Sequence, residues 1–391
     1  MNKTIRRIYD YALVFLPRKN KREIKELVAF VLITDFALSL VWIFTPIFLY
    51  DQGFSLLEIL VFFFTSYLLY FFLLPLAGKM IKSWGFEHCM FYSNFFTILF
   101  YLSLYGITYS KYMIVASCIL MAVDKMIYWP AYHCDLAMFS SPTAKGRQIN
   151  LLYILDSIVC IIAPVIGGLI LANLGFRFLF ICVSFLLMLA GVPLFTTIEK
   201  FEPESFSYKD AIKRVFKKEN RRKLISYLGF GEEMIGIYIW PIFVYLVVIN
   251  FFNIGLIFSG ATLIMILSTI FVGKMVDQRD KRKILKWGTA MLSLSWLAKI
   301  FIRTPLSLFA VESFSEVSKK VVTVPQMAII YQDAKKSHLV KKIVFLEMSL
   351  AIGKIAIIAV LIGFSFFFSE ITVLQISFIL AAAMSLLYSL L

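Results

Sequence analysis

The sequence repeats itself at a fixed offset of 195 residues, close to half of its 391-residue length. Residues 46–50 read Pro-Ile-Phe-Leu-Tyr, and residues 241–245 read Pro-Ile-Phe-Val-Tyr. The same offset relates Gly78-Lys79-Met80 to Gly273-Lys274-Met275, Lys125 to Lys320, Pro130 to Pro325, and Gly168 to Gly363. Because these matches share one offset without a gap, we predict two copies of one structural unit joined in parallel.

The composition indicates that these units lie in a membrane. The chain is 61% apolar and only 16% charged, and it contains 40 phenylalanines. Its apolar runs are continuous and about 20 residues long, which is the length of a membrane-spanning helix. They do not show the alternation of apolar and polar residues that is typical of a barrel strand. We therefore predict an all-α polytopic membrane protein with twelve transmembrane helices in two six-helix halves. The expected helices are 27–49, 56–77, 86–108, 111–138, 148–172, 176–197, 224–249, 252–272, 284–303, 306–331, 343–366 and 370–391.

Lysine and arginine predict the orientation. The segment before the first helix carries eight of them, and most of the rest lie in the loops after helices 2, 4, 6, 8 and 10. The loops on the other side carry only Lys111, Arg177 and Arg303. The positive-inside rule then places both termini in the cytoplasm and favours the plasma (inner) membrane. Nucleic-acid binding is disfavoured, because the basic residues are dispersed over short loops.

Four regions follow from this topology. We expect a cytoplasmic segment at 1–26, an N-terminal half at 27–197, a central cytoplasmic loop at 198–223 and a C-terminal half at 224–391. In the central loop, Ser207 is expected to cap an amphipathic helix through Lys218. No cleavable signal peptide is predicted, and the five cysteines lack metal-ligand spacing. We predict no metal, no cofactor, no catalytic constellation and no enzyme activity. We expect the protein to be a monomer.

Two motifs resemble those of a known family. The loop after helix 8 reads Gly-Lys-Met-Val-Asp-Gln-Arg-Asp-Lys-Arg-Lys from residue 273, which is similar to G-x-[LM]-x-D-R-x-G-R-[RK] of the major facilitator superfamily, with Asp280 in place of the second glycine. The copy from Gly78 is altered, with Lys82 at the acidic position. Helix 5 ends with Ala-Pro-Val-Ile-Gly-Gly at 163–168, which resembles the family's G-P-x-x-G-G.

The resemblance implies a transporter in which helices 1, 4, 7 and 10 line a central pathway. It also implies that Gly273, Asp277, Arg282 and, less clearly, Gly78 form a loop latch. Physically, Asp277 can interact with the N-terminal dipole of a neighbouring helix and with a basic partner. The alternative is a basic loop that happens to contain one acid.

Ionisable residues within the helices mark candidate sites, because each costs at least about 2.5–3.5 kcal/mol near the bilayer centre unless it has a partner or faces a cavity. Asp124 and Lys125 point about 100° apart, so only one can face the pathway, and Lys125 is preferred because it has a repeat mate. Glu316 and Lys320 either form a buried intrahelical pair or serve the substrate. The substrate and coupling candidates are Asp35, Asp124, Lys125, Tyr128, Asp156, Glu232, Glu233, Glu316, Lys320 and Lys354.

Two prolines are expected to act as gates. Pro130 in helix 4 and Pro325 in helix 10 are repeat mates, and each lies about one turn beyond a lysine. We expect both to kink their helices and let the cytoplasmic ends bend. The alternative is that they are prolines without a role in motion, which membrane helices tolerate.

Together these features predict a secondary transporter that moves a small polar or anionic solute by alternating access, coupled to a proton. Asp35, Glu232 and Glu233 either carry this proton or form salt bridges on the cytoplasmic side. The mixture of lysines and acids favours such a solute over an apolar cation. The expected partners are a small-molecule substrate, the proton and the lipid bilayer. The alternatives are a proton-driven multidrug efflux antiporter and a membrane sensor of the same fold that does not transport.

Overall fold

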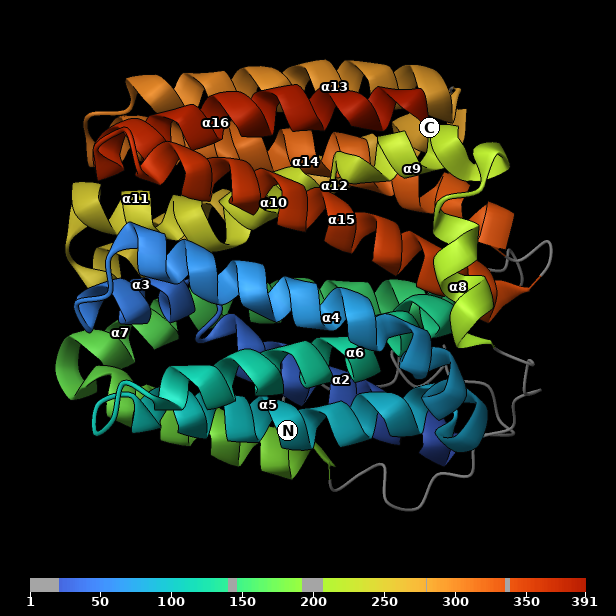
Figure 1. The fold of residues 1–391 in the computed structure, drawn as a ribbon, viewed down its shortest axis with the longest axis horizontal. Helices are drawn as coiled ribbons and strands as arrows, with labels where there is room; N and C mark the ends of the chain where they lie inside the picture. Colours follow the sequence, from blue (N-terminus) through green and yellow to red (C-terminus); the bar gives the residue numbers. More distant parts are fainter. Residues whose placement is uncertain (1–20, 140–145, 192–206, 279, 335–337) are drawn as a thin grey trace, which may run out of the picture.

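The computed structural model describes residues 21–139, 146–191, 207–278, 280–334 and 338–391, without the side chains of 21–28, 139, 146–156, 270, 273–274 and 276–277. Within these residues the protein is almost entirely helical, and no strand is present. The N-terminal and C-terminal helices form two adjacent groups, drawn in blue to green and in yellow to red in Figure 1.

The N-terminal group contains the first six expected segments. The first segment is divided into α2 (Lys21–Ser39) and α3 (Phe44–Asp51), and α4 (Leu56–Trp84), α5 (Phe86–Gly106) and α6 (Met113–Phe139) follow. One long helical stretch, α7 (Gly146–Gly191), contains the fifth and sixth segments. It is interrupted at Gly175, whose φ of 76° lies in the left-handed region that glycine adopts without a steric penalty, and the chain reverses direction there.

The C-terminal group begins with the short helix α8 (Tyr208–Val215). The seventh segment is divided into α9 (Arg221–Leu228), α10 (Gly231–Met234), a π-helical turn (Ile235–Ile239) and α11 (Trp240–Val248). The remaining segments are α12 (Phe251–Gln278), α13 (Lys281–Ala298) with a 3₁₀ turn to Phe301, α14 (Pro305–Ala334), α15 (Leu339–Ser365) and α16 (Glu370–Leu386).

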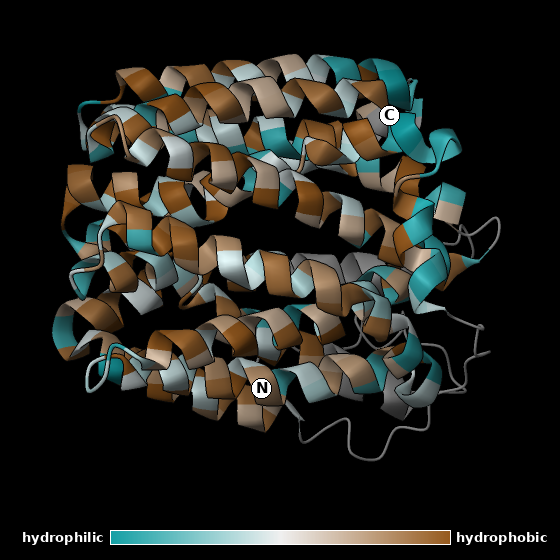
Figure 2. Ribbon diagram, in the orientation of Figure 1, coloured by the Kyte–Doolittle hydropathy of each residue, from teal (hydrophilic) through white to brown (hydrophobic). Residues whose placement is uncertain are grey.

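Each of the twelve expected segments therefore coincides with a helical stretch in the described part of the chain. In the described residues, eight helices are long and apolar enough to cross a membrane by length and composition, and one of them, Ser157–Gly191, contains both the fifth and the sixth segments. The charged residues of α14 explain why it falls outside that set, although its 30 residues exceed the thickness of a bilayer. Hydrophilic residues gather at the end of the bundle that carries α8 and α9 (Figure 2). We call this the basic end, and the other the opposite end.

The repeat is visible in the backbone. Residues 40–43 form a turn between α2 and α3, and their repeat mates 235–238 lie in the π-helical turn of the seventh segment. In each copy the irregular backbone lies just before a proline, Pro46 or Pro241, which has no N–H for the bond to the carbonyl four residues earlier. The duplicated proline thus accounts for a break in both the first and the seventh segment.

The two halves meet along two pairs of helices, and the 195-residue offset relates each pair to the other. Helix α4 packs against α15, and the first part of α7 packs against α12. The second contact is close because it uses glycine on both sides. A side-chain carbon on Gly168 would lie 2.5 Å from the carbonyl oxygen of Phe251, and one on Gly255 would meet the carbonyl of Pro164. The Pro-Val-Ile-Gly-Gly segment therefore brings the backbones of the two halves together.

Hydrogen bonds link the halves at the opposite end. The hydroxyl of Tyr50 donates to Glu370 at 3.2 Å, and that carboxylate also accepts from the backbone N–H of Leu56 at 3.0 Å. The hydroxyl of Tyr245, the repeat mate of Tyr50, donates to Asp51 at 3.1 Å. The two tyrosines are related by the 195-residue offset, whereas their acidic partners are not.

The basic end differs from expectation in detail. The central-loop helix α8 ends at Val215 rather than at Lys218, and the hydroxyl of Tyr208 donates to the backbone carbonyl of Phe72 in α4 at 3.0 Å. In the loop after α12, Asp280 caps α13 by accepting from the N–H of Arg282 at 2.9 Å, so the acid that replaces the motif's glycine has a structural task.

The proposed latch is described only in part. Gly273 lies in α12, the side chain of Asp277 lies outside the described residues, Gly78 is buried in α4, and Arg282 is exposed. Of the predicted cytoplasmic segment 1–26, residues 1–20 lie outside the described residues. Of the predicted central loop 198–223, residues 198–206 lie outside them. The latch therefore stays a prediction.

We predict that Gly168→Val destabilises the protein by about 1–3 kcal/mol, because the added side chain forces α7 away from α12. The matched control is Gly363→Val at the repeat mate, where an added carbon meets nothing within 4 Å. Thermal unfolding of the purified protein in detergent measures both. Equal unfolding temperatures for the two variants would show that the close contact of α7 and α12 does not limit stability.

Candidate functional site

A cavity of about 340 Å³ lies between the two halves. The N-terminal half contributes residues of α4 and α6 together with Trp42 from the turn after α2, and the C-terminal half contributes the irregular seventh segment, α13, α14 and α15. The two backbone irregularities that the repeat relates both reach this cavity, through Trp42 and its mate Ile237. A π-helical turn is frequent at functional sites, and here it lies between the acidic residues and the tryptophan of one helix.

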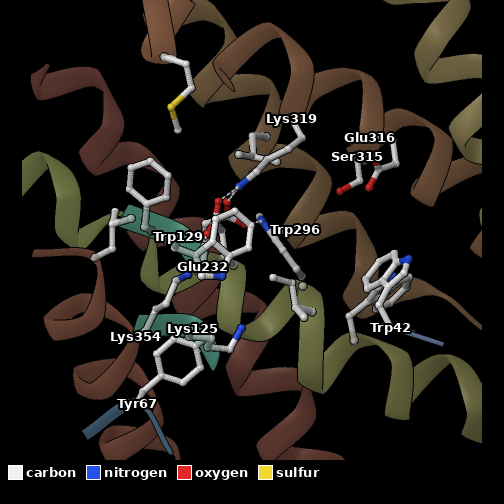
Figure 3. A pocket seen from close by; sticks show the side chains of 18 of the residues that line it. Trp42, Tyr67, Lys125, Trp129, Glu232, Trp296, Ser315, Glu316, Lys319 and Lys354 are labelled. Atoms are coloured by element: carbon white, nitrogen blue, oxygen red, sulfur yellow. Dashed lines mark hydrogen bonds and ion pairs between the residues drawn. The ribbon is translucent and has the colours of Figure 1, made fainter. Parts of the chain in front are cut away.

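Glu232 is the most densely bonded carboxylate in the cavity wall. It is 2% exposed and accepts hydrogen bonds from Trp296 Nε1 at 3.1 Å and from the hydroxyl of Tyr388 at 3.0 Å. Lys319 also donates to it, as Figure 3 shows. Four elements thus meet at one carboxylate, and these hydrogen bonds offset the cost of burying it.

Glu233 and Lys354 form a more accessible pair beside this cluster. The Lys354 ammonium lies 3.1 Å from one oxygen of Glu233, and Lys319 lies 3.5 Å from the other. The Lys354 ammonium also lies 5.4 Å from the ring centre of Tyr67, across the boundary between the halves. Glu233 is therefore held by two lysines from two helices, with 23% of its side chain still exposed.

Lys299 and Glu312 form a pair that is almost completely buried. Their charged atoms are 3.0 Å apart, and each side chain is 3% exposed. The ammonium also lies 3.8 Å from the ring centre of Trp240 and 4.2 Å from that of Trp296, which are cation–π distances. With a carboxylate and two aromatic faces around it, this lysine is satisfied by the protein itself.

A further cluster joins the halves on the basic side of the cavity. The hydroxyl of Tyr70 donates to Glu347 at 2.7 Å, and Nε2 of His133 lies 3.1 Å from the other oxygen, without hydrogen-bond alignment. Nδ1 of His133 lies 2.7 Å from the hydroxyl of Tyr331. His133 of α6 thus joins the two halves through Glu347 of α15 and Tyr331 of α14.

Lys125 and Glu316 line the cavity in a different way. Among the described residues, Lys125 has no carboxylate within 4 Å of its ammonium, which lies 5.5 Å from the ring centre of Tyr67 and 6.0 Å from that of Trp129. Within the same residues Glu316 has no cation within 4 Å; Lys299 and Lys320 act on it from farther away. Figure 3 shows Glu316 apart from the Glu232 cluster. The buried Glu316–Lys320 contact pair, one of the two alternatives left open above, does not form within 4 Å, although the two residues lie one helical turn apart.

The structure brings about half of the predicted site residues together. Those that line the cavity are Lys125, Glu232, Glu233, Glu316 and Lys354. Asp124 points away and accepts a hydrogen bond from Thr97 at 2.7 Å, which agrees with the preference for Lys125. The residues outside the cavity lining are Asp35, Asp124, Tyr128 and Lys320, and the side chain of Asp156 lies outside the described residues.

The repeat predicted the wrong lysine of α14 for the cavity. Lys320 is the mate of Lys125, but its neighbour Lys319 enters the cavity, and adjacent helical residues point about 100° apart. Sequence reasoning also missed the aromatic walls, which are Trp42, Tyr67, Trp129, Trp240 and Trp296. The chain contains 6 tryptophans, 19 tyrosines and 40 phenylalanines, and no sequence pattern selects these five rings among them.

The arrangement can bind and release a charged solute. Among the residues searched, no group of three or more histidines, cysteines or carboxylates could hold a metal ion. Glu232, Glu233 and Glu347 are held by hydrogen bonds and ion pairs from the surrounding side chains. Such pairs can exchange partners with a bound solute, which is the chemistry of reversible binding.

The comparisons with known proteins agree with this arrangement. The family model of the Major Facilitator Superfamily matches residues 27–253, more than half of the chain. The fold is similar to that of the transporter FucP in its outward conformation, with a TM-score of 0.63 and 14% identity over 94% of this chain and 97% of that one.

A variant of the E. coli fucose:proton symporter FucP is similar at a TM-score of 0.61, with the same identity and coverage. No curated protein matches the chain by sequence.

We predict that Lys299→Met destabilises the protein by about 3–5 kcal/mol, because it leaves the Glu312 carboxylate buried without a counter-charge. The double variant Lys299→Met/Glu312→Leu, which removes both charges, should recover most of that loss. Thermal unfolding in detergent measures both variants. If the double variant unfolded as early as the single one, the pair would not be a self-contained structural element.

Proposed function

The chain belongs to the Major Facilitator Superfamily and is an integral membrane protein of the secondary-transporter class, and from this premise we propose that it moves a small polar or anionic solute by alternating access. The observation that carries the proposal is the charged cavity between the two halves. Transporters built from repeated halves bind their substrate at the repeat interface near the middle of the bilayer.

Contacts on both sides of the cavity support the alternating-access part. Toward the opposite end, Tyr245 bonds to Asp51, and the glycine contact of α7 with α12 holds the halves together. Toward the basic end, Tyr70 and His133 meet Glu347. Both sets consist of hydrogen bonds and close packing between the two halves. Rocking of the halves would break one set of contacts while the other set stays formed.

Glu233 is the best-placed proton carrier. It holds Lys354 and Lys319 by its charge, and it is more accessible than Glu232, which is 2% exposed. Protonation of Glu233 would remove the charge that holds Lys354, and this ammonium would become free to interact with a solute or with Tyr67 of the other half. Proton binding would then be linked to the contacts between the halves.

Lys125 is the proposed anchor for the anionic group of the solute. It is a cation on the N-terminal wall that no carboxylate of the described residues holds within 4 Å. An unpaired ammonium in the middle of a membrane protein is costly, and an anionic or strongly polar group can reduce this cost.

Three further roles belong to the same proposal. Pro130 and Pro325 lie within α6 and α14, where their missing N–H groups would let the basic ends bend. The loop with Asp277 would latch that end. Both termini would face the cytoplasm from a plasma (inner) membrane, as the distribution of basic residues predicts.

We predict that purified protein in liposomes changes the luminal pH when its solute is added, and that Glu233→Gln reduces this proton flux at least tenfold while solute binding persists. The physical reason is that the amide cannot exchange a proton. A panel of small polar and anionic solutes, screened by thermal shift, identifies the solute, and a luminal pH dye reports the flux. Glu219→Gln is the control, since Glu219 is 71% exposed on the linker.

Asp35→Asn and Glu232→Gln are tested in the same assay. Full substrate-driven proton flux in all three carboxylate variants would exclude these groups as carriers. Solute uptake without a change in luminal pH would show that transport is not coupled to protons.

A further inference from the structure

The charges of the cavity nearly cancel in pairs. Lys299 is held by Glu312, Lys354 by Glu233, and Lys319 by Glu232 with help from Glu233. On the basic side, Glu347 is held by Tyr70 and His133. After these pairs are assigned, one cation and one carboxylate of the described lining stay without an opposite charge within 4 Å.

These two are Lys125 and Glu316, and they lie on different halves. Lys125 belongs to α6, whereas Glu316 belongs to α14. Both line the same cavity, but they do not meet across it, because no contact within 4 Å joins them. The space between them is therefore bounded by a positive charge on one wall and a negative charge on the other.

The rest of the wall is mostly aromatic. Trp42 and Trp129 of the N-terminal half and Trp240 and Trp296 of the C-terminal half all face the cavity. The volume of about 340 Å³ is at the lower end of the range for small-molecule sites. A solute that fills this space must be small, and it must present apolar surface as well as charge.

We propose that the solute is a small zwitterion with an apolar body, which has the chemistry of an α-amino acid with an apolar side chain. Its carboxylate would lie against Lys125, its ammonium against Glu316, and its side chain against the tryptophans. This inference rests on the proposed transport function and specifies the class of substrate.

The two obvious alternatives leave one charge unsatisfied. A simple anion at Lys125 leaves the Glu316 carboxylate without a partner in the same cavity and adds a second negative charge near it. A simple cation at Glu316 has the opposite defect at Lys125. A solute that carries both charges satisfies Lys125 and an ionised Glu316 together, and by contacting both α6 and α14 it would favour closure of the cavity around it.

The experiment uses the full-length protein in detergent and measures quenching of tryptophan fluorescence, since four tryptophans line the cavity. The probes are L-leucine, N-acetyl-L-leucine, which lacks the ammonium, and L-leucine methyl ester, which lacks the carboxylate. We expect L-leucine to bind at least tenfold more tightly than either blocked derivative.

Two variants test the assignment of each group. Lys125→Met should lose L-leucine binding at least tenfold. Glu316→Gln should also weaken L-leucine binding, but should bind N-acetyl-L-leucine more tightly than the wild type does, because the acid that repels an anion is gone. That gain cannot come from a misfolded protein. Glu219→Gln on the exposed linker is the control and should bind like the wild type.

Wild-type binding of N-acetyl-L-leucine as tight as that of L-leucine, with proton uptake, would overturn the inference, because Glu316 would then be protonated in a site for anions. Absence of L-leucine binding would overturn it too. Liposome flux separates the two proposals: transport of a sugar or a simple anion without transport of L-leucine would leave the transport function standing and remove only the zwitterion. Absence of flux for every solute of the panel, by a protein that binds L-leucine, would contradict the transport function alone.

Discussion

Charged groups inside an apolar helical bundle need partners, and this need organises the C-terminal half of the protein. Lys299 and Glu312 are held together between two tryptophan rings, and Glu232 receives hydrogen bonds from Trp296 and Tyr388 as well as from a lysine. These bonds join α13, α14, the irregular seventh segment and the end of the chain. Because each buried charge is costly alone, the helices can pack only in an arrangement that brings the partners together.

The two halves share a backbone but not a charge pattern. The mates Pro46 and Pro241 interrupt the first and seventh segments at equivalent places, and the mates Tyr50 and Tyr245 both form cross-half hydrogen bonds. The N-terminal half contributes Lys125 and aromatic rings to the cavity, whereas the C-terminal half contributes the paired acids and lysines. In the proposed function, the symmetric backbone would serve the rocking motion, and the difference in charge between the halves would serve selective binding of the solute.

Most of the fold could be predicted from the sequence, and the site only in part. Long apolar runs locate helices reliably, because any helix that crosses a bilayer needs about 20 such residues. The side chain that faces the cavity depends on rotation about the helix axis. The repeat therefore pointed to Lys320 where Lys319 enters, and helical spacing suggested a Glu316–Lys320 pair that does not form. The side chains of Asp156 and Asp277 lie outside the described residues, so their predicted roles are unchanged.

By itself the sequence determined the membrane environment, the helical segments and the duplication, because hydrophobicity and a constant offset are properties of the chain read in order. Only the tertiary structure decided which charges are satisfied by the protein and which face the cavity without an opposite charge. Glu232 and Glu316 look alike in the sequence, yet Glu232 is surrounded by hydrogen-bond donors, whereas Glu316 has no cation within 4 Å among the described residues and is acted on by Lys299 and Lys320 only from farther away. The physical reason is that partnership depends on distances between helices, which no spacing along one helix can fix.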